Sequence, residues 1–127
     1  MSEKKKVLIV DDMVSMRMLV NMLLKHEDLE LDEAPDGNVA LEKCQSDSPP
    51  DLILMDVIMP KLSGLECCQM LKSSEKTKNI PVIVVTTRGE DNQREEAFAA
   101  GCDDYATKPI NKHDLVKKIR RLLAQQS

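Results

Sequence analysis

The sequence is poor in aromatic residues, with no tryptophan, one phenylalanine (Phe98) and one tyrosine (Tyr105) among 127 residues. Its core must therefore be built from aliphatic side chains and methionine, since 42% of the residues are hydrophobic. An excess of positive charge is absent as well, because 18 basic and 22 acidic residues give a formal net charge of −4. Proteins that bind nucleic acids usually combine a basic surface with aromatic rings. We therefore expect no direct nucleic-acid partner.

Long apolar runs and paired cysteines are absent too. The run Val7–Val10 is followed at once by two aspartates, which is far short of the apolar core of a secretory signal. No other run approaches the roughly 20 residues of a membrane-spanning helix. The four cysteines form no C-x-x-C pair, which argues against a zinc site and favours free thiols packed as small apolar side chains. These absences predict a cytoplasmic protein with no membrane partner.

Four apolar runs and one weaker candidate have the composition of β-strands: residues 7–10, 29–34, 52–55, 81–86 and 104–108. Three of them are continuous and rich in Val, Ile and Leu, which is typical of central parallel strands covered on both faces. The run 29–34 alternates between apolar and polar residues and is expected at an edge of the sheet.

Helical patterns lie between these runs. Apolar residues recur at helical spacing from Met16 to Leu24, and further helices are expected over residues 37–46, 64–74, 90–100 and 111–124. The methionines of the first helical segment are expected to fill the core and its rim: Met13, Met16, Met18 and Met22. Strand and helix thus alternate five times, which predicts an α/β fold with a doubly wound parallel sheet, in a single domain of residues 1–127.

Polar residues occur at the predicted carboxyl ends of these strands. Asp11 and Asp12 follow the first strand, Asp56 follows the third, Thr86 ends the fourth and Lys108 ends the fifth. Taken alone, the aspartates could cap helices or turns, and the threonine could be an ordinary strand residue. In a doubly wound sheet, however, ligands bind at this edge. The convergence of these residues on one edge therefore favours a functional site.

Three clustered carboxylates and one ammonium group give this edge a formal charge of −3 + 1 = −2, which one divalent ion would neutralise. Oxygen ligands with room for water suit Mg²⁺, with Mn²⁺ as an alternative. A metal beside a carboxylate suits phosphoryl transfer, because it neutralises phosphate oxygens while Asp56 attacks phosphorus. Thr86 and Lys108 could then hold the oxygens of the transferred group.

Four segments, "VLIVDD", "LILMDVIMPKLSG", "PVIVVTT" and "GCDDYATKP", together resemble the receiver domain of two-component response regulators over essentially the whole chain. The resemblance implies a flavodoxin-like sheet of five parallel strands in the order 2-1-3-4-5 with five helices, as in the chemotaxis regulator of this family. It also implies that Asp56 is the phosphoacceptor. Mg²⁺ would be held directly by Asp12, through water by Asp11, by Asp56 and by the backbone carbonyl of Ile58.

The same resemblance implies a switch. Lys108 would pair with the phosphoryl oxygens, Thr86 would bond one of them after phosphorylation, and Tyr105 would turn into the space that Thr86 leaves. The surface of the fourth helix, fifth strand and fifth helix would then change and be read by a downstream target protein. A sensor histidine kinase or a phosphotransfer protein would be the donor. The chain would be a monomer or a weak phosphorylation-dependent dimer, and not an enzyme beyond its own phosphoryl transfer and slow self-dephosphorylation.

Two positions depart from the chemotaxis-type pattern. Ile58 stands two residues after Asp56, where an acid or amide is missing, and Arg88 stands two residues after Thr86. Both side chains are expected to border the path of attacking water, so we hypothesise that Ile58 slows hydrolysis of the acyl phosphate. The stretch "DDMVSMR" is similar to chemotaxis-type single-domain receivers, whereas "GCDDY" is similar to receivers that dimerise, which leaves the subfamily open.

Other functions fit parts of the pattern. A haloacid-dehalogenase-like phosphohydrolase also uses a strand-end aspartate and Mg²⁺, but its D-x-D motif needs an acid where Ile58 stands. A flavodoxin-like electron carrier needs aromatic rings and a phosphate loop, and Asp11 and Asp12 would repel phosphate. A receiver used only for docking, without phosphorylation, and a receiver cut from a longer regulator with an output domain both remain compatible with the sequence.

Overall fold

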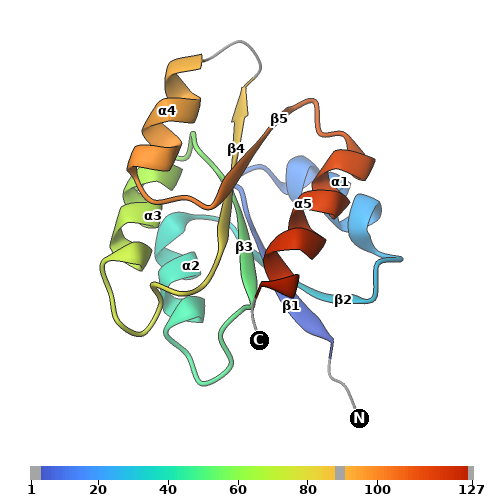
Figure 1. Ribbon diagram of the computed structural model, residues 1–127, viewed down its shortest axis with the longest axis horizontal. Helices are drawn as coiled ribbons and strands as arrows, with labels where there is room; N and C mark the ends of the chain where they lie inside the picture. Colours follow the sequence, from blue (N-terminus) through green and yellow to red (C-terminus); the bar gives the residue numbers. More distant parts are fainter. Residues whose placement is uncertain (1–3, 88–90, 126–127) are drawn as a thin grey trace.

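The computed structural model describes residues 4–87 and 91–125 of the chain. Within these residues strands and helices alternate, as Figure 1 shows. In chain order they are β1 (Lys5–Val10), α1 (Val14–Leu24), β2 (Leu29–Ala34), α2 (Gly37–Cys44), β3 (Leu52–Asp56), α3 (Gly64–Lys72), β4 (Val82–Thr87), α4 (Asp91–Ala99), β5 (Asp104–Lys108) and α5 (Lys112–Ala124). The predicted α/β alternation is therefore confirmed.

The described strands form one parallel sheet in the order β2-β1-β3-β4-β5. This is the flavodoxin-like order that the sequence resemblance implied, and β2 lies at an edge as expected. The register pairs Val10 with Met55 and Asp56 with Val85. The carboxyl ends of β1, β3 and β4 therefore lie together at one edge of the sheet.

Helices cover both faces of the sheet. Figure 1 shows α2, α3 and α4 on one face and α1 and α5 on the other. Each face has its own buried cluster, and successive strand residues alternate between them: Leu8 and Val10 pack toward α2 and α3, whereas Val7 and Ile9 pack toward α1 and α5. The cluster under α2 and α3 combines aliphatic side chains and alanine with methionine and cysteine, whereas the cluster under α1 and α5 consists of aliphatic side chains and alanine. The aliphatic core inferred from the composition is confirmed, and every residue of β3 is buried.

The expectation for the methionines of α1 is wrong at three positions. The inward face of the helix consists of Val20 and Leu24, which are 5% and 0% exposed. Met18 and Met22 lie on the opposite face and are 59% and 64% exposed, and Met13, just before the helix, is 53% exposed. Because α1 packs on the sheet with one narrow stripe, methionines outside that stripe remain in solvent.

Two predictions from the composition concern cysteines and membranes. The four cysteines are buried free thiols, as predicted: Cys44, Cys67, Cys68 and Cys102. In the part of the chain that the structure describes, no helix has the length and apolar character needed to cross a bilayer.

Candidate functional site

Three carboxylates meet at the carboxyl edge of the sheet. Asp11 and Asp12 follow β1, and Asp56 is the last residue of β3. Among the described residues these three form a group in which one oxygen from each lies within 4.8 Å of the others. Asp11 and Asp56 are only 6% and 7% exposed, whereas Asp12 faces solvent. The structure therefore brings together the acidic cluster that the sequence predicted.

The surroundings of Asp56 oppose its negative charge. Burial raises the pKa of the Asp56 carboxyl above its ordinary value, and the neighbouring Asp11 carboxylate raises it further. The Lys108 ammonium and the backbone N–H of Ile58 act in the opposite direction without reversing the shift. Lys108 is the last residue of β5, and its Nζ lies 3.4 Å from Asp56 Oδ2. The single ammonium group of Lys108 does not balance the charges of the three carboxylates. The carboxylate oxygens are ligands that suit Mg²⁺.

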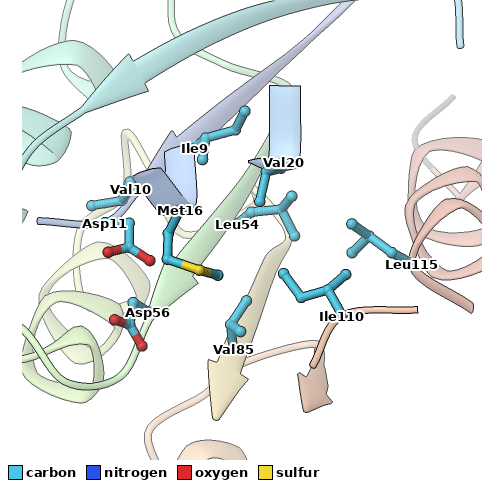
Figure 2. Close-up of a pocket in the computed structure, with 10 residues that line it drawn as sticks. All are labelled: Ile9, Val10, Asp11, Met16, Val20, Leu54, Asp56, Val85, Ile110 and Leu115. Atoms are coloured by element: carbon cyan, nitrogen blue, oxygen red, sulfur yellow. The ribbon is translucent and has the colours of Figure 1, made fainter. Parts of the chain in front are cut away.

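The floor of the acidic cluster is apolar. Figure 2 shows a small cavity with the carboxylates of Asp11 and Asp56 at one end and apolar side chains around the rest, including Met16, Leu54 and Val85. Its volume is about 10 Å³, which is room for roughly one water molecule. Charges at its rim therefore act through a poorly polarisable medium, which strengthens both the repulsion between the aspartates and the attraction of a cation.

Asp11 is fixed by several backbone contacts. Its N–H donates to the carbonyl of Ala34 at 3.2 Å, and its Oδ1 accepts from the N–H of Met13 at 2.9 Å. Met13 is the N-cap residue of α1. Asp11 therefore supports the turn that opens the helix and also belongs to the acidic cluster.

Thr86 is buried near the end of β4, at 3% exposed. Its hydroxyl donates to the carbonyl of Ala106 on β5 at 3.5 Å. The hydroxyl is thus engaged with the neighbouring strand. Arg88, the other position singled out in this segment, lies outside the described residues.

Tyr105 on β5 is half-buried and surrounded by three side chains. Phe98 of α4 meets its ring edge-on, with centroids 5.8 Å apart. The Arg94 guanidinium and the Lys118 ammonium each lie 5.1 Å from the ring centroid. The ring therefore joins α4, β5 and α5 through aromatic and cation–π contacts.

Ile58 stands two residues after Asp56, the last residue of β3. Its backbone N–H is directed at the Asp56 carboxylate, and its side chain is 63% exposed. A large apolar group therefore stands in solvent beside the acidic cluster, where the sequence placed it.

The model of the response regulator receiver domain matches residues 7–120 of the chain. The protein belongs to this family. Among curated relatives, the transcriptional regulatory protein ResD of Bacillus subtilis is 36% identical over 126 residues, which are 99% of this chain and 51% of ResD. Histidine kinase P4 of Formosa agariphila is 38% identical over 95% of this chain and 9% of its own length. The chain spans about half or less of these two relatives.

Solved structures show the same receiver fold. The chemotaxis response regulator CheY4 of Vibrio cholerae superposes with a TM-score of 0.84 at 33% identity, covering 94% of this chain and 98% of CheY4. The signal receiver domain of a signal transduction histidine kinase from Syntrophus aciditrophicus superposes with a TM-score of 0.88 at 28% identity, covering 97% and 92%. Both similarities extend over nearly the whole receiver domain.

Two residues important to this receiver site were not singled out from the sequence. A Cβ atom on Gly64 would lie 2.1 Å from the backbone oxygen of Asp56, so only glycine allows α3 to begin against the end of β3. Arg17 of α1 donates from Nη1 to the carbonyl of Asp11 at 2.6 Å. Neither contact has a signal in the sequence alone, because both depend on how helices pack at the sheet edge.

Proposed function

We propose that this receiver domain is a phosphorylation-dependent switch in which Asp56 accepts a phosphoryl group from a sensor histidine kinase or a phosphotransfer protein. The observation that carries the proposal is the grouping of Asp11, Asp12 and Asp56 within 4.8 Å, with Lys108 3.4 Å from Asp56. A buried nucleophile beside two further acids and one ammonium group has the charge pattern of a metal-assisted phosphoryl acceptor.

In the proposed reaction an Asp56 oxygen attacks phosphorus, an O–P bond forms, and the P–N bond to the donor histidine breaks. The side chains of Asp11, Asp12 and Asp56 and the carbonyl of Ile58 would hold Mg²⁺, which supplies positive charge against the phosphoryl oxygens when bound. Lys108 adds a second positive charge on the same oxygens. The chain would thus promote only its own phosphorylation and slow dephosphorylation, and would not act as an enzyme on other substrates.

The proposed output passes through Thr86 and Tyr105. The Thr86 hydroxyl would exchange its 3.5 Å bond to Ala106 for a bond to the phosphoryl group, whose oxygens are stronger acceptors. Tyr105 would then leave its contacts with Arg94 and Lys118 and turn inward. This changes the surface of α4, β5 and α5, which a downstream protein would read.

One observation favours a second form of output. ResD bears the name of a transcriptional regulatory protein, and this chain covers only 51% of it. In a longer regulator of that kind the receiver would control an attached output domain. We propose a separate target protein in the cytoplasm as the first form of output, with chemotaxis as one candidate pathway because of the similarity to CheY4.

Beryllofluoride, a mimic of the phosphoryl group, tests the switch without a kinase. We expect its addition with Mg²⁺ to shift amide resonances around Thr86 and across α4, β5 and α5 in ¹H–¹⁵N NMR spectra. Thr86→Ala should bind the mimic at the acidic cluster but lose the shifts around Tyr105. Shifts confined to the acidic cluster in the wild type would contradict the proposed output surface.

A further inference from the structure

Arg17 links the first turn of α1 to the acidic cluster. Its Nη1 donates to the carbonyl oxygen of Asp11 at 2.6 Å, and its Nε donates to Glu33 Oε1 at 2.9 Å. The Arg17 side chain is only 13% exposed. A planar guanidinium has donors in a fixed fork, so it can bind a carbonyl and a carboxylate at the same time.

The orientation of Arg17 is itself fixed by its neighbours. The other oxygen of Glu33, Oε2, accepts from Asn21 Nδ2 at 2.9 Å, and the same nitrogen lies 3.0 Å from the backbone carbonyl of Arg17. Glu33 is on β2 and Asn21 is one helical turn after Arg17. Side chains of α1 and β2 thus form a closed network, which allows Arg17 to hold the Asp11 carbonyl in one direction.

The Asp11 carbonyl belongs to the peptide plane that joins Asp11 to Asp12. Because this plane is rigid, fixing its oxygen also fixes the positions of the Asp12 N and Cα atoms, from which the Asp12 side chain starts. The N–H of Asp11 is already held by Ala34, and its carboxylate by Met13. The bond from Arg17 holds the third polar group of Asp11, its carbonyl, in the peptide that joins the two acids.

We propose that Arg17 is a positioning residue for the cation site: it holds the Asp11–Asp12 peptide so that both carboxylates reach the same divalent ion. This inference rests on the proposed Mg²⁺ site and adds a residue that orients its ligands without binding the ion. Residues that orient metal ligands typically change metal affinity by about 10- to 100-fold when they are substituted.

The sign of the effect separates positioning from simple electrostatics. Arg17 carries a positive charge beside a site for a cation, so its Coulomb interaction alone opposes Mg²⁺ binding. If charge were its only influence, Arg17→Gln would bind Mg²⁺ more tightly. A positioning role predicts the opposite, because the released peptide lets the two carboxylates diverge.

The test is Mg²⁺ affinity, measured by isothermal titration calorimetry and by amide shifts in NMR spectra at constant ionic strength. We expect Arg17→Gln to bind Mg²⁺ roughly 10-fold more weakly than the wild type. Arg17→Lys should also bind weakly, since a lysine keeps the charge but cannot span Glu33 and the Asp11 carbonyl. Arg120→Gln is the matched control, because Arg120 also binds a carboxylate and a carbonyl, both of Glu27, and this variant should bind Mg²⁺ like the wild type.

Equal or tighter Mg²⁺ binding by Arg17→Gln would overturn the positioning role while leaving the proposed function intact. Absence of Mg²⁺ binding by the wild type would overturn the metal site and the role of Arg17 together. If Arg17→Gln does not fold, Asn21→Ala replaces it, because it removes a neutral side chain that supports Glu33 and Arg17 and changes no charge. A smaller loss of affinity in Asn21→Ala would support the role, and an unchanged affinity would overturn it.

Discussion

At the scale of single residues, Asp56 carries a charge that its surroundings oppose. It is nearly buried, stands beside Asp11, and has Lys108 as a partner at 3.4 Å. An acid in this position costs stability unless a cation or a proton compensates it. Without a metal ion, the burial of Asp56 and its repulsion by Asp11 therefore destabilise the folded protein. The proposed reaction uses the same Asp56 carboxylate as its nucleophile.

Ile58 allows a direct test beside that nucleophile. Its exposed side chain stands two residues after Asp56, where we expect it to restrict the approach of water to an acyl phosphate. We predict that Ile58→Asn speeds dephosphorylation by up to roughly tenfold, which corresponds to about 1.4 kcal/mol in the barrier. The measurement is the decay of the phosphorylated protein after removal of a small-molecule donor.

Met70→Asn is the control for Ile58→Asn, because Met70 is similarly exposed at 51% but lies on α3. Its dephosphorylation rate should equal that of the wild type. An unchanged rate in Ile58→Asn would show that this side chain does not limit hydrolysis.

At the scale of elements, the junction of β3 and α3 holds the backbone of Asp56 in place. The N–H of Gly64 donates to the carbonyl of Val57 at 2.9 Å, and a capping box between Ser63 and Glu66 closes the first turn of α3. Lys61 takes a positive φ of 70° in the same loop. The helix therefore starts in direct contact with the backbone of Asp56.

We predict that Gly64→Ala lowers the free energy of unfolding by about 2 kcal/mol or more, since its Cβ would overlap backbone atoms that cannot move aside. Urea unfolding measures the loss. Gly37→Ala is the matched control: its Cβ would meet only the flexible side chain of Leu62, so its cost should be below about 1 kcal/mol. Equal losses in the two variants would contradict the special role of the junction.

The strands were the most predictable elements. Residues 29–34 and 104–108 agree with β2 and β5, and Asp56 belongs to β3 rather than following it. Continuous runs of branched residues bounded by turns make such strands recognisable. The helices predicted over 37–46 and 64–74 were each two residues too long.

The helix ends were missed for a local physical reason. The hydroxyl of Ser46 donates to the carbonyl of Lys43, and the hydroxyl of Ser73 donates to the carbonyl of Gln69. Serine side chains that bond nearby carbonyls compete with a further helical turn. The charged cluster was predictable because each member ends a strand, whereas Arg17 acts through a backbone carbonyl and required the packed structure.

At the scale of the whole molecule, the acidic cluster couples stability to pH. The pKa of Asp56 is raised in the folded state, chiefly by burial, so the folded protein binds this proton more tightly than the unfolded chain does. Its contribution to stability is therefore present at low pH and is lost as the pH rises through the unfolded value of 3.8 toward the folded value.

We predict that Asp56→Asn raises Tm in the presence of a chelator at pH 7, and that this gain disappears near pH 3, where the carboxyl is neutral in both states. A gain of about 1 kcal/mol in the free energy of unfolding corresponds to a rise in Tm of roughly 4 °C in a domain of this size. Thermal unfolding, monitored by circular dichroism, measures Tm of the wild type and the variant at pH 7 and near pH 3. Asp47→Asn, in an exposed loop, should leave Tm unchanged, and a lower Tm for Asp56→Asn at pH 7 would contradict the account.

The central claim, that Asp56 accepts a phosphoryl group, is tested most directly by the intact mass of the protein after incubation with acetyl phosphate and Mg²⁺. We predict one added phosphoryl group on the wild type, absent in Asp56→Asn and absent in excess chelator. An unmodified wild-type mass, under conditions that preserve acyl phosphates, or an adduct that persists in Asp56→Asn, would contradict it and would favour a receiver that acts by docking alone.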